Sequence, residues 1–272
     1  MSLKLVTAAA IEPVNLAQAK VAAAILGNTD DGLLQVLITA AREQAETITH
    51  RALVTSTWDL KLDAFPESSD KAIELPLPPL QSVMSITYLD GDGATQIMDS
   101  GDYAVDTSSE PGSVYPAYGA SWPSTQDVRN AVTVRFVAGY PITSVAASTI
   151  SAAATDDSFN DSASGFGSFK AGQGITVAGF TETANNGEFF ITLATAAKLT
   201  TSGSLTLEAS GDAVTIQAAA CPRGIQQWIL ARVCSLYEQR ESFVVGVNFK
   251  FHELNGRFLD GLLDPFVVPL VV

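Results

Sequence analysis

The feature that most constrains the fold is a break between a strand-like run at residues 132–141 and a helix-like run that begins at residue 221. The residues between them, 144–220, contain no proline and are rich in Ala, Ser, Thr and Gly. A chain tolerates such an insertion where a host domain exposes a loop whose two ends lie close together. The sequence therefore predicts a host domain, residues 1–143 and 221–272, that carries an inserted domain at residues 144–220.

The composition is typical of a folded protein. Of the 272 residues, 47% are hydrophobic and 16% are charged, which is enough apolar sequence for a packed core. No stretch has the apolar length that is needed to cross a membrane. The first residues contain one lysine and only a short apolar run, unlike a signal peptide. We expect a protein that is made and used in a cytosol.

The formal net charge of −14 excludes one class of function. The inserted segment has seven acids and two lysines, so it contributes −5 and the host −9. No run of lysine or arginine is present. A protein that binds a nucleic-acid backbone needs clustered basic side chains to neutralise the phosphates. The sequence predicts that DNA is repelled rather than bound.

Helical signals occur at both ends of the host. Asn15 is a suitable N-cap and Gln18 occupies the capping-box position. Apolar residues from Leu33 to Ile48 recur at spacings of three and four, and Pro222 suits the first turn of a helix. Helices are predicted over residues 16–26, 29–50 and 222–240.

Between the first two helices and the insertion, the apolar period changes to two, which predicts a small antiparallel sheet over residues 54–137. The turn from Asp90 to Gly93 lies between two alternating segments. It lacks the further ligands of a calcium loop and is interpreted as a hairpin turn. The insertion has β-strand patterns throughout, with a turn at Asn185 to Gly187. The predicted fold class is α+β: a helical bundle with a small antiparallel β sheet, plus an inserted all-β domain of sandwich or barrel type.

Cysteines and histidines give no site in the sequence. Cys221 and Cys234 fall on one predicted helix with their backbones roughly 20 Å apart, too far for a disulfide. We expect both to be buried apolar residues. His50 and His252 have no partner at metal-ligand spacing, and packing at a helix end or on the surface is the favoured interpretation.

The sequence also gives no strong evidence for a cation site, a phosphate-binding loop or a catalytic nucleophile. Asp156, Asp157 and Asp161 could bind a cation, although a solvated acidic loop is the favoured interpretation. Neither a phosphate-binding glycine loop nor a nucleophile elbow is present. We therefore predict no catalytic residue, no metal, no cofactor and no enzymatic activity.

The last residues form an apolar tail, which is a liability unless something covers it. The protein's own core could cover it, or a partner could, with the tail adding to that partner as an edge strand. The candidate interface residues are Phe266, Val267, Val268, Leu270, Val271 and Val272.

A series of short blocks runs in order through the host. The blocks are residues 3–7, 12–14, 16–20, 40–46, 51–55, 76–83, 122–123, 132–140, 222–227 and 237–246. In this order they resemble the head–tail connector (adaptor) proteins of tailed bacteriophages. Residues 185–189 of the insertion resemble a small β domain that is appended to various phage structural proteins.

The resemblance implies a structural virion protein that forms a ring, commonly of twelve copies, below the portal. Such a ring extends the DNA channel, joins the capsid to the tail, and serves virus assembly and DNA ejection. The implied partners are the portal protein, a tail or head-completion (stopper) protein, and further copies of the chain. Genomic DNA would pass without specific binding, because acidic walls repel phosphates. The implied location is the virion neck, with the host cytoplasm during assembly, and the implied portal contact is the C-terminal part.

An acidic binding or adhesion module is the alternative. In that case the β insertion would recognise a host or capsid surface. The candidate aromatic platform would be Phe180, Phe189 and Phe190, although an export signal would also be expected.

Overall fold

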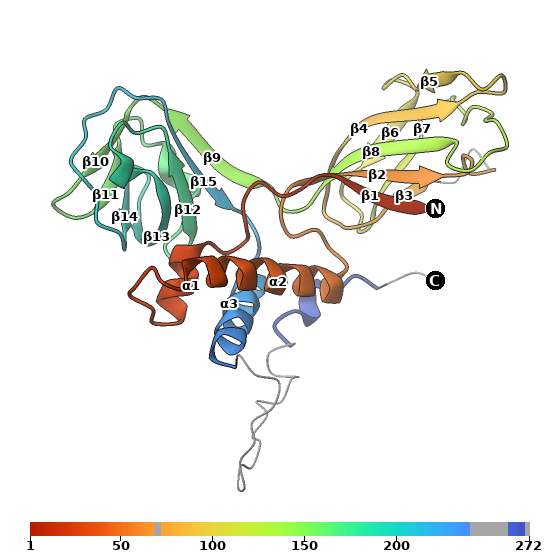
Figure 1. Cartoon of the computed structure of the whole chain (residues 1–272). Coiled ribbons are helices and arrows are strands. Elements are labelled where there is room, and N and C mark those ends of the chain that lie inside the picture. Colours follow the sequence, from red (N-terminus) through yellow and green to blue (C-terminus); the bar gives the residue numbers. More distant parts are fainter. Residues whose placement is uncertain (68–71, 240–260, 270–272) are drawn as a thin grey trace, which may run out of the picture. The chain divides into compact units, whose positions relative to one another are not determined.

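The computed structural model describes residues 1–67, 72–239 and 261–269 (Figure 1). These residues form two compact units. The first comprises residues 1–10, 46–141 and 266–269, and the second comprises residues 11–45, 142–239 and 261–265. The first unit has two sheets and the second has one, and each unit has its own buried core.

The first unit contains two antiparallel sheets. The five-stranded sheet has the order β1 (Ser2–Thr7), β2 (Ser56–Leu62), β8 (Val132–Ala138), β4 (Leu80–Leu89) and β5 (Thr95–Ile97). The three-stranded sheet has the order β3 (Ile73–Leu75), β7 (Gly112–Pro116) and β6 (Tyr103–Asp106). Strict alternation explains β8: Val132, Val134 and Phe136 are buried, whereas Thr133 and Arg135 between them are only partly covered.

Both sheets contribute to the core of the first unit. Leu60 and Ile86 from the larger sheet join Leu75 and Val114 from the smaller one in a single cluster of buried side chains. The loop after β7 is fixed by aromatic contacts, because Trp122 stacks on Phe65 with ring centroids 4.9 Å apart. Tyr88 meets the same ring edge-on at 5.6 Å.

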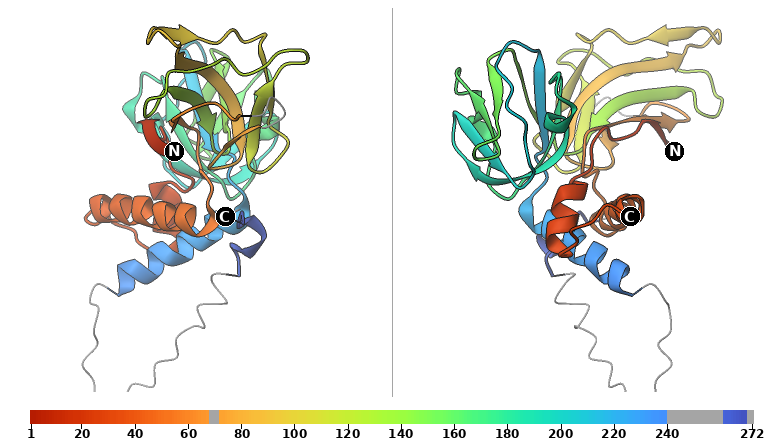
Figure 2. Two further views of the ribbon diagram at one scale, coloured as in Figure 1. Left: turned by 90° about the vertical axis from the view of Figure 1, so that its right-hand side faces the viewer. Right: turned by 60° about the vertical axis from the view of Figure 1, so that its left-hand side comes forward.

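The second unit contains a seven-stranded antiparallel sheet that curls around its own core (Figure 2). Its order is β10 (Ile150–Ala153), β11 (Ser158–Asp161), β14 (Lys198–Thr201), β13 (Gly187–Ala194), β12 (Gly174–Ala178), β15 (Val214–Ala219) and β9 (Ile142–Ala147). The strands β9 and β15 pair from Ile142 opposite Ala219 to Ala147 opposite Val214. The two ends of this stretch of chain therefore lie side by side.

The described residues contain three α-helices, α1 (Leu16–Ala22), α2 (Asp31–Thr49) and α3 (Arg223–Glu238). Short 3-10 turns are η1 (Gly165–Ser168), η2 (Thr183–Asn185) and η3 (Asp264–Phe266). The helix α1 packs against α3 and against β13. The apolar stripe of α3 is buried, as its spacing predicts, and includes Ile225, Trp228, Ile229 and Val233. None of the helices in the described ranges is long and apolar enough to span a bilayer.

The predicted helical bundle with a small sheet is wrong. The chain is mostly β, with three antiparallel sheets among its described residues. The first predicted helix is shorter than expected: it ends at Ala22, and Ala24 has a left-handed backbone with a φ of 54°. Periodicity shows which face of a helix is apolar, but it does not show that the face meets another helix. The strand β1 was also missed, because the alternation of Leu3, Lys4 and Leu5 is too short to identify a strand.

Two predictions that depend only on neighbouring residues, the capping box and the hairpin turn, are correct. The capping box at Asn15 is confirmed, since Gln18 N–H donates to Asn15 Oδ1 and Asn15 N–H donates to Gln18 Oε1. The hairpin turn is confirmed as well: Asp90 and Ala94 close it between β4 and β5.

Candidate interaction surfaces

No group of three or more His, Cys, Asp and Glu side chains in the described ranges is placed to hold a metal ion. Cys221 is buried and Cys234 is half-buried, and neither is in a disulfide. Burial raises the pKa of the Cys234 thiol. His50 follows α2 with a φ of 55°, and His252 lies outside the described residues.

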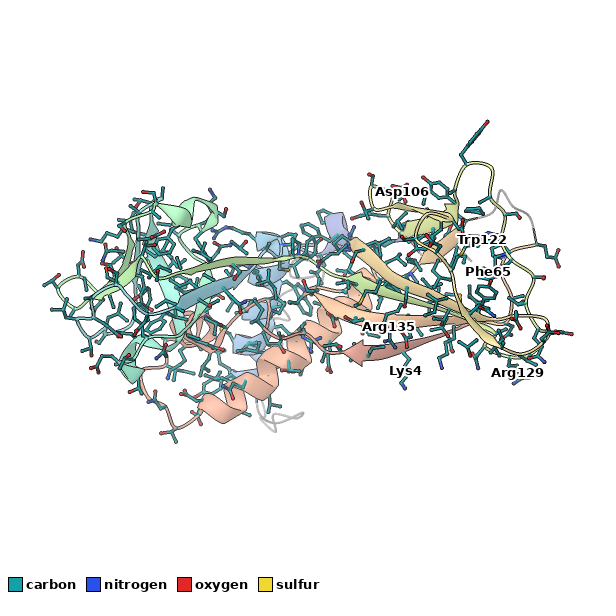
Figure 3. The ribbon with its side chains drawn as sticks, turned by 90° about the horizontal axis from the view of Figure 1, so that it is seen from above. Lys4, Phe65, Asp106, Trp122, Arg129 and Arg135 are labelled. Atoms are coloured by element: carbon teal, nitrogen blue, oxygen red, sulfur yellow. The ribbon has the colours of Figure 1, made fainter. Side chains whose placement is uncertain are left out.

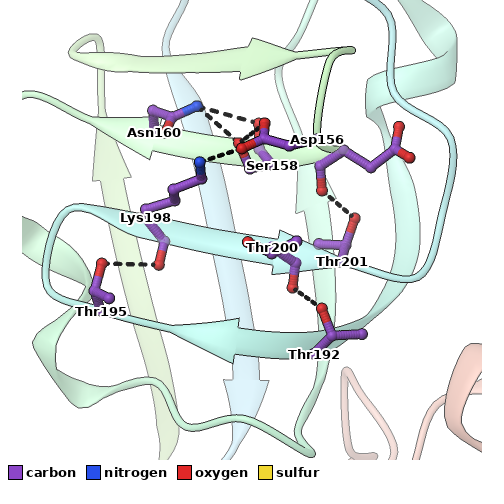
Figure 4. Close-up of polar contacts among 9 residues, drawn as sticks. Asp156, Ser158, Asn160, Thr192, Thr195, Lys198, Thr200 and Thr201 are labelled. Carbon is purple, nitrogen blue, oxygen red and sulfur yellow. Dashed lines mark hydrogen bonds and ion pairs between the residues drawn. The ribbon is translucent and has the colours of Figure 1, made fainter.

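The three aspartates that could bind a cation instead make contacts within the β domain, and Figure 4 shows those of Asp156. Asp156 pairs with Lys198 and accepts a hydrogen bond from Ser158 Oγ at 2.7 Å. Asp157 accepts from the backbone N–H of Leu205 at 2.9 Å. These contacts give each carboxylate a protein partner, so the arrangement is that of a braced loop.

Asp161 has the same structural role. It is buried and accepts from Thr149 Oγ1 at 2.5 Å and from the N–H groups of Ala163 and Gly165 at 3.0 and 2.7 Å. Burial disfavours ionisation, yet these hydrogen bonds hold the pKa of the Asp161 carboxyl below its ordinary value.

The aromatic residues of the insertion belong mostly to its core. Phe180 and Phe189 are buried, and both pack on the buried ring of Phe159, with centroid distances of 5.6 and 5.3 Å. Phe190 is half-buried. The exposed aromatic platform that an adhesion module would use is therefore not formed by these three side chains.

The described part of the apolar tail, residues 266–269, belongs to the first unit. Val268 is buried, and its N–H donates to the Thr49 carbonyl at 3.0 Å. Phe266 is half-buried at the end of η3, and its carbonyl accepts from Arg51 Nε at 2.5 Å. Val267 is exposed. The remaining candidates, Leu270, Val271 and Val272, lie outside the described residues.

Arg51 also binds Glu110, next to the point where it binds the tail. Its two terminal nitrogens bind the carboxylate of Glu110, with Nη1 at 2.7 Å from Oε1. The hydrogen bond from Arg51 lowers the pKa of Glu110, and the same bond raises the pKa of Arg51. The carbonyl of Phe266 is thus bound by a guanidinium whose orientation is fixed.

The helix α1 is tied to the β domain through its cap. Asn15 is 8% exposed, and its Nδ2 donates to the carbonyls of Ile175 and Phe189 at 3.1 and 3.0 Å. Leu16 N–H donates to Glu188 Oε2 at 2.7 Å. A Cβ on Gly174 would lie 2.5 Å from the Asn15 side chain, so glycine is needed for this close approach.

Basic side chains meet on the outer face of the five-stranded sheet, where Figure 3 shows Lys4 and Arg135. The register places Asp59 opposite both of these residues. Arg135 binds Asp59 through two bonds of 2.8 and 2.9 Å, and this lowers the pKa of Asp59. These basic residues lie on separate strands, so they form no run in the sequence. Only the register of the sheet brings them together.

Comparison with known proteins identifies the fold but not the family. No family model matches the chain, and no curated protein matches it. Among solved structures, the chain is similar to one from the virion of the native gene transfer agent (GTA) particle, with a TM-score of 0.57 and 16% identity. It is also similar to a chain from the neck of the empty GTA particle, computed with C6 symmetry, with a TM-score of 0.56 and 15% identity. Each alignment covers 100% of this chain and 98% of the other. At this identity the likeness shows a shared fold over the full length.

Proposed function

We propose that this chain is a structural protein of a virion neck, a head–tail connector (adaptor) that forms a ring between the portal and the tail. The observation that supports the proposal most directly is the fold shared over 100% of the chain with chains of GTA virion and neck particles. The ordered blocks of the host that resemble adaptors point the same way. A further structural neighbour comes from a neck computed with C12 symmetry, at a TM-score of 0.50. A ring of twelve copies is the assembly that we propose for this chain.

The C-terminal tail is the proposed portal contact. Val267 is exposed, whereas Val268 and the Phe266 carbonyl are held by the chain's own residues. Phe266 and Val268 therefore hold the described part of the tail on the first unit. We assign the portal contact to Val267 together with Leu270, Val271 and Val272.

Residues 144–220 are proposed as an inserted domain. Their support is the ladder between β9 and β15, which brings the two ends together, and a hydrophobic cluster drawn from this stretch alone. The bonds from Asn15 add that the insertion is docked on α1 of the host.

The test of the neck role is location. A peptide tag on the chain should be found by immunogold labelling at the junction of head and tail in particles that carry it. Deleting the gene should leave heads and tails that do not join. Normal tailed particles from the deletion strain, or a label elsewhere on the particle, would contradict the proposal.

DNA binding provides a separate check. With a net charge of −14, the purified chain should show no appreciable affinity for duplex DNA at physiological salt. Micromolar binding that weakens steeply with added salt would show that the chain grips DNA rather than guiding it.

A further inference from the structure

One end of the five-stranded sheet is positively charged, although the chain as a whole is acidic. Lys4, Lys61 and Arg135 lie on the face that points away from the core, and Asp59 is the acid that the register places among them. Arg135 is occupied by Asp59. Within the described part of the chain, neither lysine side chain has a hydrogen bond or a short ion pair, and both act on Asp59 only through longer-range electrostatics. This end of the sheet therefore carries two lysines that are available to a partner's acids.

The strand β1 forms the free edge of the sheet on this side. It is the first strand of the sheet, and in the described residues no further strand pairs with its outer side. Leu3 and Leu5 are opposite Leu60 and Trp58, on the core side, yet they are 38% and 44% exposed. Edge strands are usually blunted by charges or proline, and in β1 this protection is limited to Lys4, which a partner's acids could neutralise. The edge thus combines open backbone groups, aliphatic side chains and positive charge.

The opposite edge of the same sheet is exposed and negatively charged. The strand β5 is the last in the order, and all three of its residues are exposed, with Ile97 at 74%. Residues 90–102 around it contain four aspartates and no lysine or arginine. Asp90 is held by Gln96 and by backbone N–H groups, so the hairpin that presents these acids is well formed.

We propose that the β1 edge of one copy docks against the β5 edge, residues 90–102, of a second copy. The lysines at positions 4 and 61 would face the aspartates around β5. Complementary charge of this kind selects a partner and speeds its encounter. The inference rests on the proposed function and deepens it by naming the subunit interface of the ring.

The two edge strands, β1 and β5, lie on opposite sides of one sheet and present different surfaces. A contact between them is therefore heterologous. Each copy can then bind one neighbour through β1 and another through β5. Such contacts repeat until the assembly closes into a ring or extends as a filament. A single type of interface is sufficient for a ring of any copy number.

Charge reversal tests the interface. In the full-length chain, Lys4→Glu with Lys61→Glu reverses one edge, and Asp92→Lys with Asp102→Lys reverses the other. Neither of these aspartates uses its side chain in a hydrogen bond to a described residue. Lys170→Glu is the matched control, because Lys170 is exposed and lies in the second unit.

Sedimentation velocity and native mass spectrometry would measure self-association. Each double variant alone should bind at least about tenfold more weakly than wild type. An equimolar mixture of the two should regain association, because opposite charges meet again, and this recovery also shows that both variants are folded. Lys170→Glu should behave as wild type.

Three results would overturn the interface: a wild-type chain that stays monomeric over the whole concentration range, double variants that associate as wild type does, or a mixture that does not recover. The neck role is judged separately by immunogold location. A chain found in the neck whose double variants still associate disproves this interface alone. A chain that associates as proposed but is absent from the neck disproves the neck role.

Discussion

Asn15 offers the sharpest test of how the insertion is attached. Its side chain performs two tasks that substitutions can separate. Oδ1 caps α1 by accepting from Gln18 N–H at 3.0 Å, and Nδ2 donates to the carbonyls of Ile175 and Phe189. Asn15→Ser keeps an oxygen for the cap and removes both donations. Asn15→Ala removes the cap as well.

The magnitudes follow from the number of bonds that are lost. Each intramolecular hydrogen bond contributes about 1 kcal/mol to stability. Asn15→Ser should therefore lower the free energy of unfolding by about 2 kcal/mol. Loss of an N-cap costs about 1 kcal/mol more, so Asn15→Ala should lower it by about 3 kcal/mol. Asn28→Ser is the control, because Asn28 is exposed and contacts only the side chain of Lys20 through its own, so its effect should stay within about 0.5 kcal/mol.

Urea unfolding would give these values, and native-state hydrogen exchange would show where they act. Peptides from β12 and β13 should lose protection in both Asn15 variants, since their carbonyls lose the donor. If Asn15→Ser unfolds at the wild-type midpoint, the two donations do not stabilise the contact. If both variants are equally destabilised with no change in β12 and β13, Asn15 acts through the helix cap alone.

Three further predictions concern other contacts. Gly174→Ala should destabilise the second unit by about 1–3 kcal/mol in the same urea assay, because its Cβ would lie 2.4 Å from Gln18 Oε1; a neutral result would show that Gln18 moves aside freely. Glu110→Gln should change the response to acid. Arg51 lowers the pKa of Glu110, so the pair's contribution is complete above the unfolded pKa of about 4.3 and is lost as pH falls through the lower folded value. The difference in unfolding free energy between wild type and Glu110→Gln should thus be largest near neutral pH and shrink below about pH 4, and a difference that is independent of pH would contradict this linkage. Removing residues 270–272 should leave the melting temperature unchanged but reduce binding to portal-bearing capsids in a co-sedimentation assay; undiminished binding would place the portal contact elsewhere.

The sequence predicted contacts between near neighbours better than contacts between distant segments. The capping box of Asn15 and the Asp90 hairpin were found because all their partners lie within a few residues. The donations from Asn15 to Ile175 and Phe189 could not be found, because they join positions far apart in the chain and leave no period in the sequence.

The missed features share a physical cause. Lys4, Asp59 and Arg135 come from three strands, and their alignment depends on the register of the sheet rather than on any one segment. The bundle was predicted from real apolar stripes, but the stripe of α3 says nothing of what covers it. In the tail, apolar composition could not separate Val268, which is buried, from Val267, which is exposed.

The attachment of the tail has a mechanical consequence. Arg51 binds the carbonyl of Phe266, and the N–H of Val268 binds the carbonyl of Thr49. A pulling force on the C-terminal end would load these two bonds together, and Glu110 would brace the guanidinium against rotation. The load would therefore be carried by the last residue of α2, by Arg51 after it, and by the loop before β7. In the proposed neck role, tension between the phage tail and the capsid would reach the sheets of the first unit directly, and a weakened Arg51–Glu110 pair would yield at a lower force.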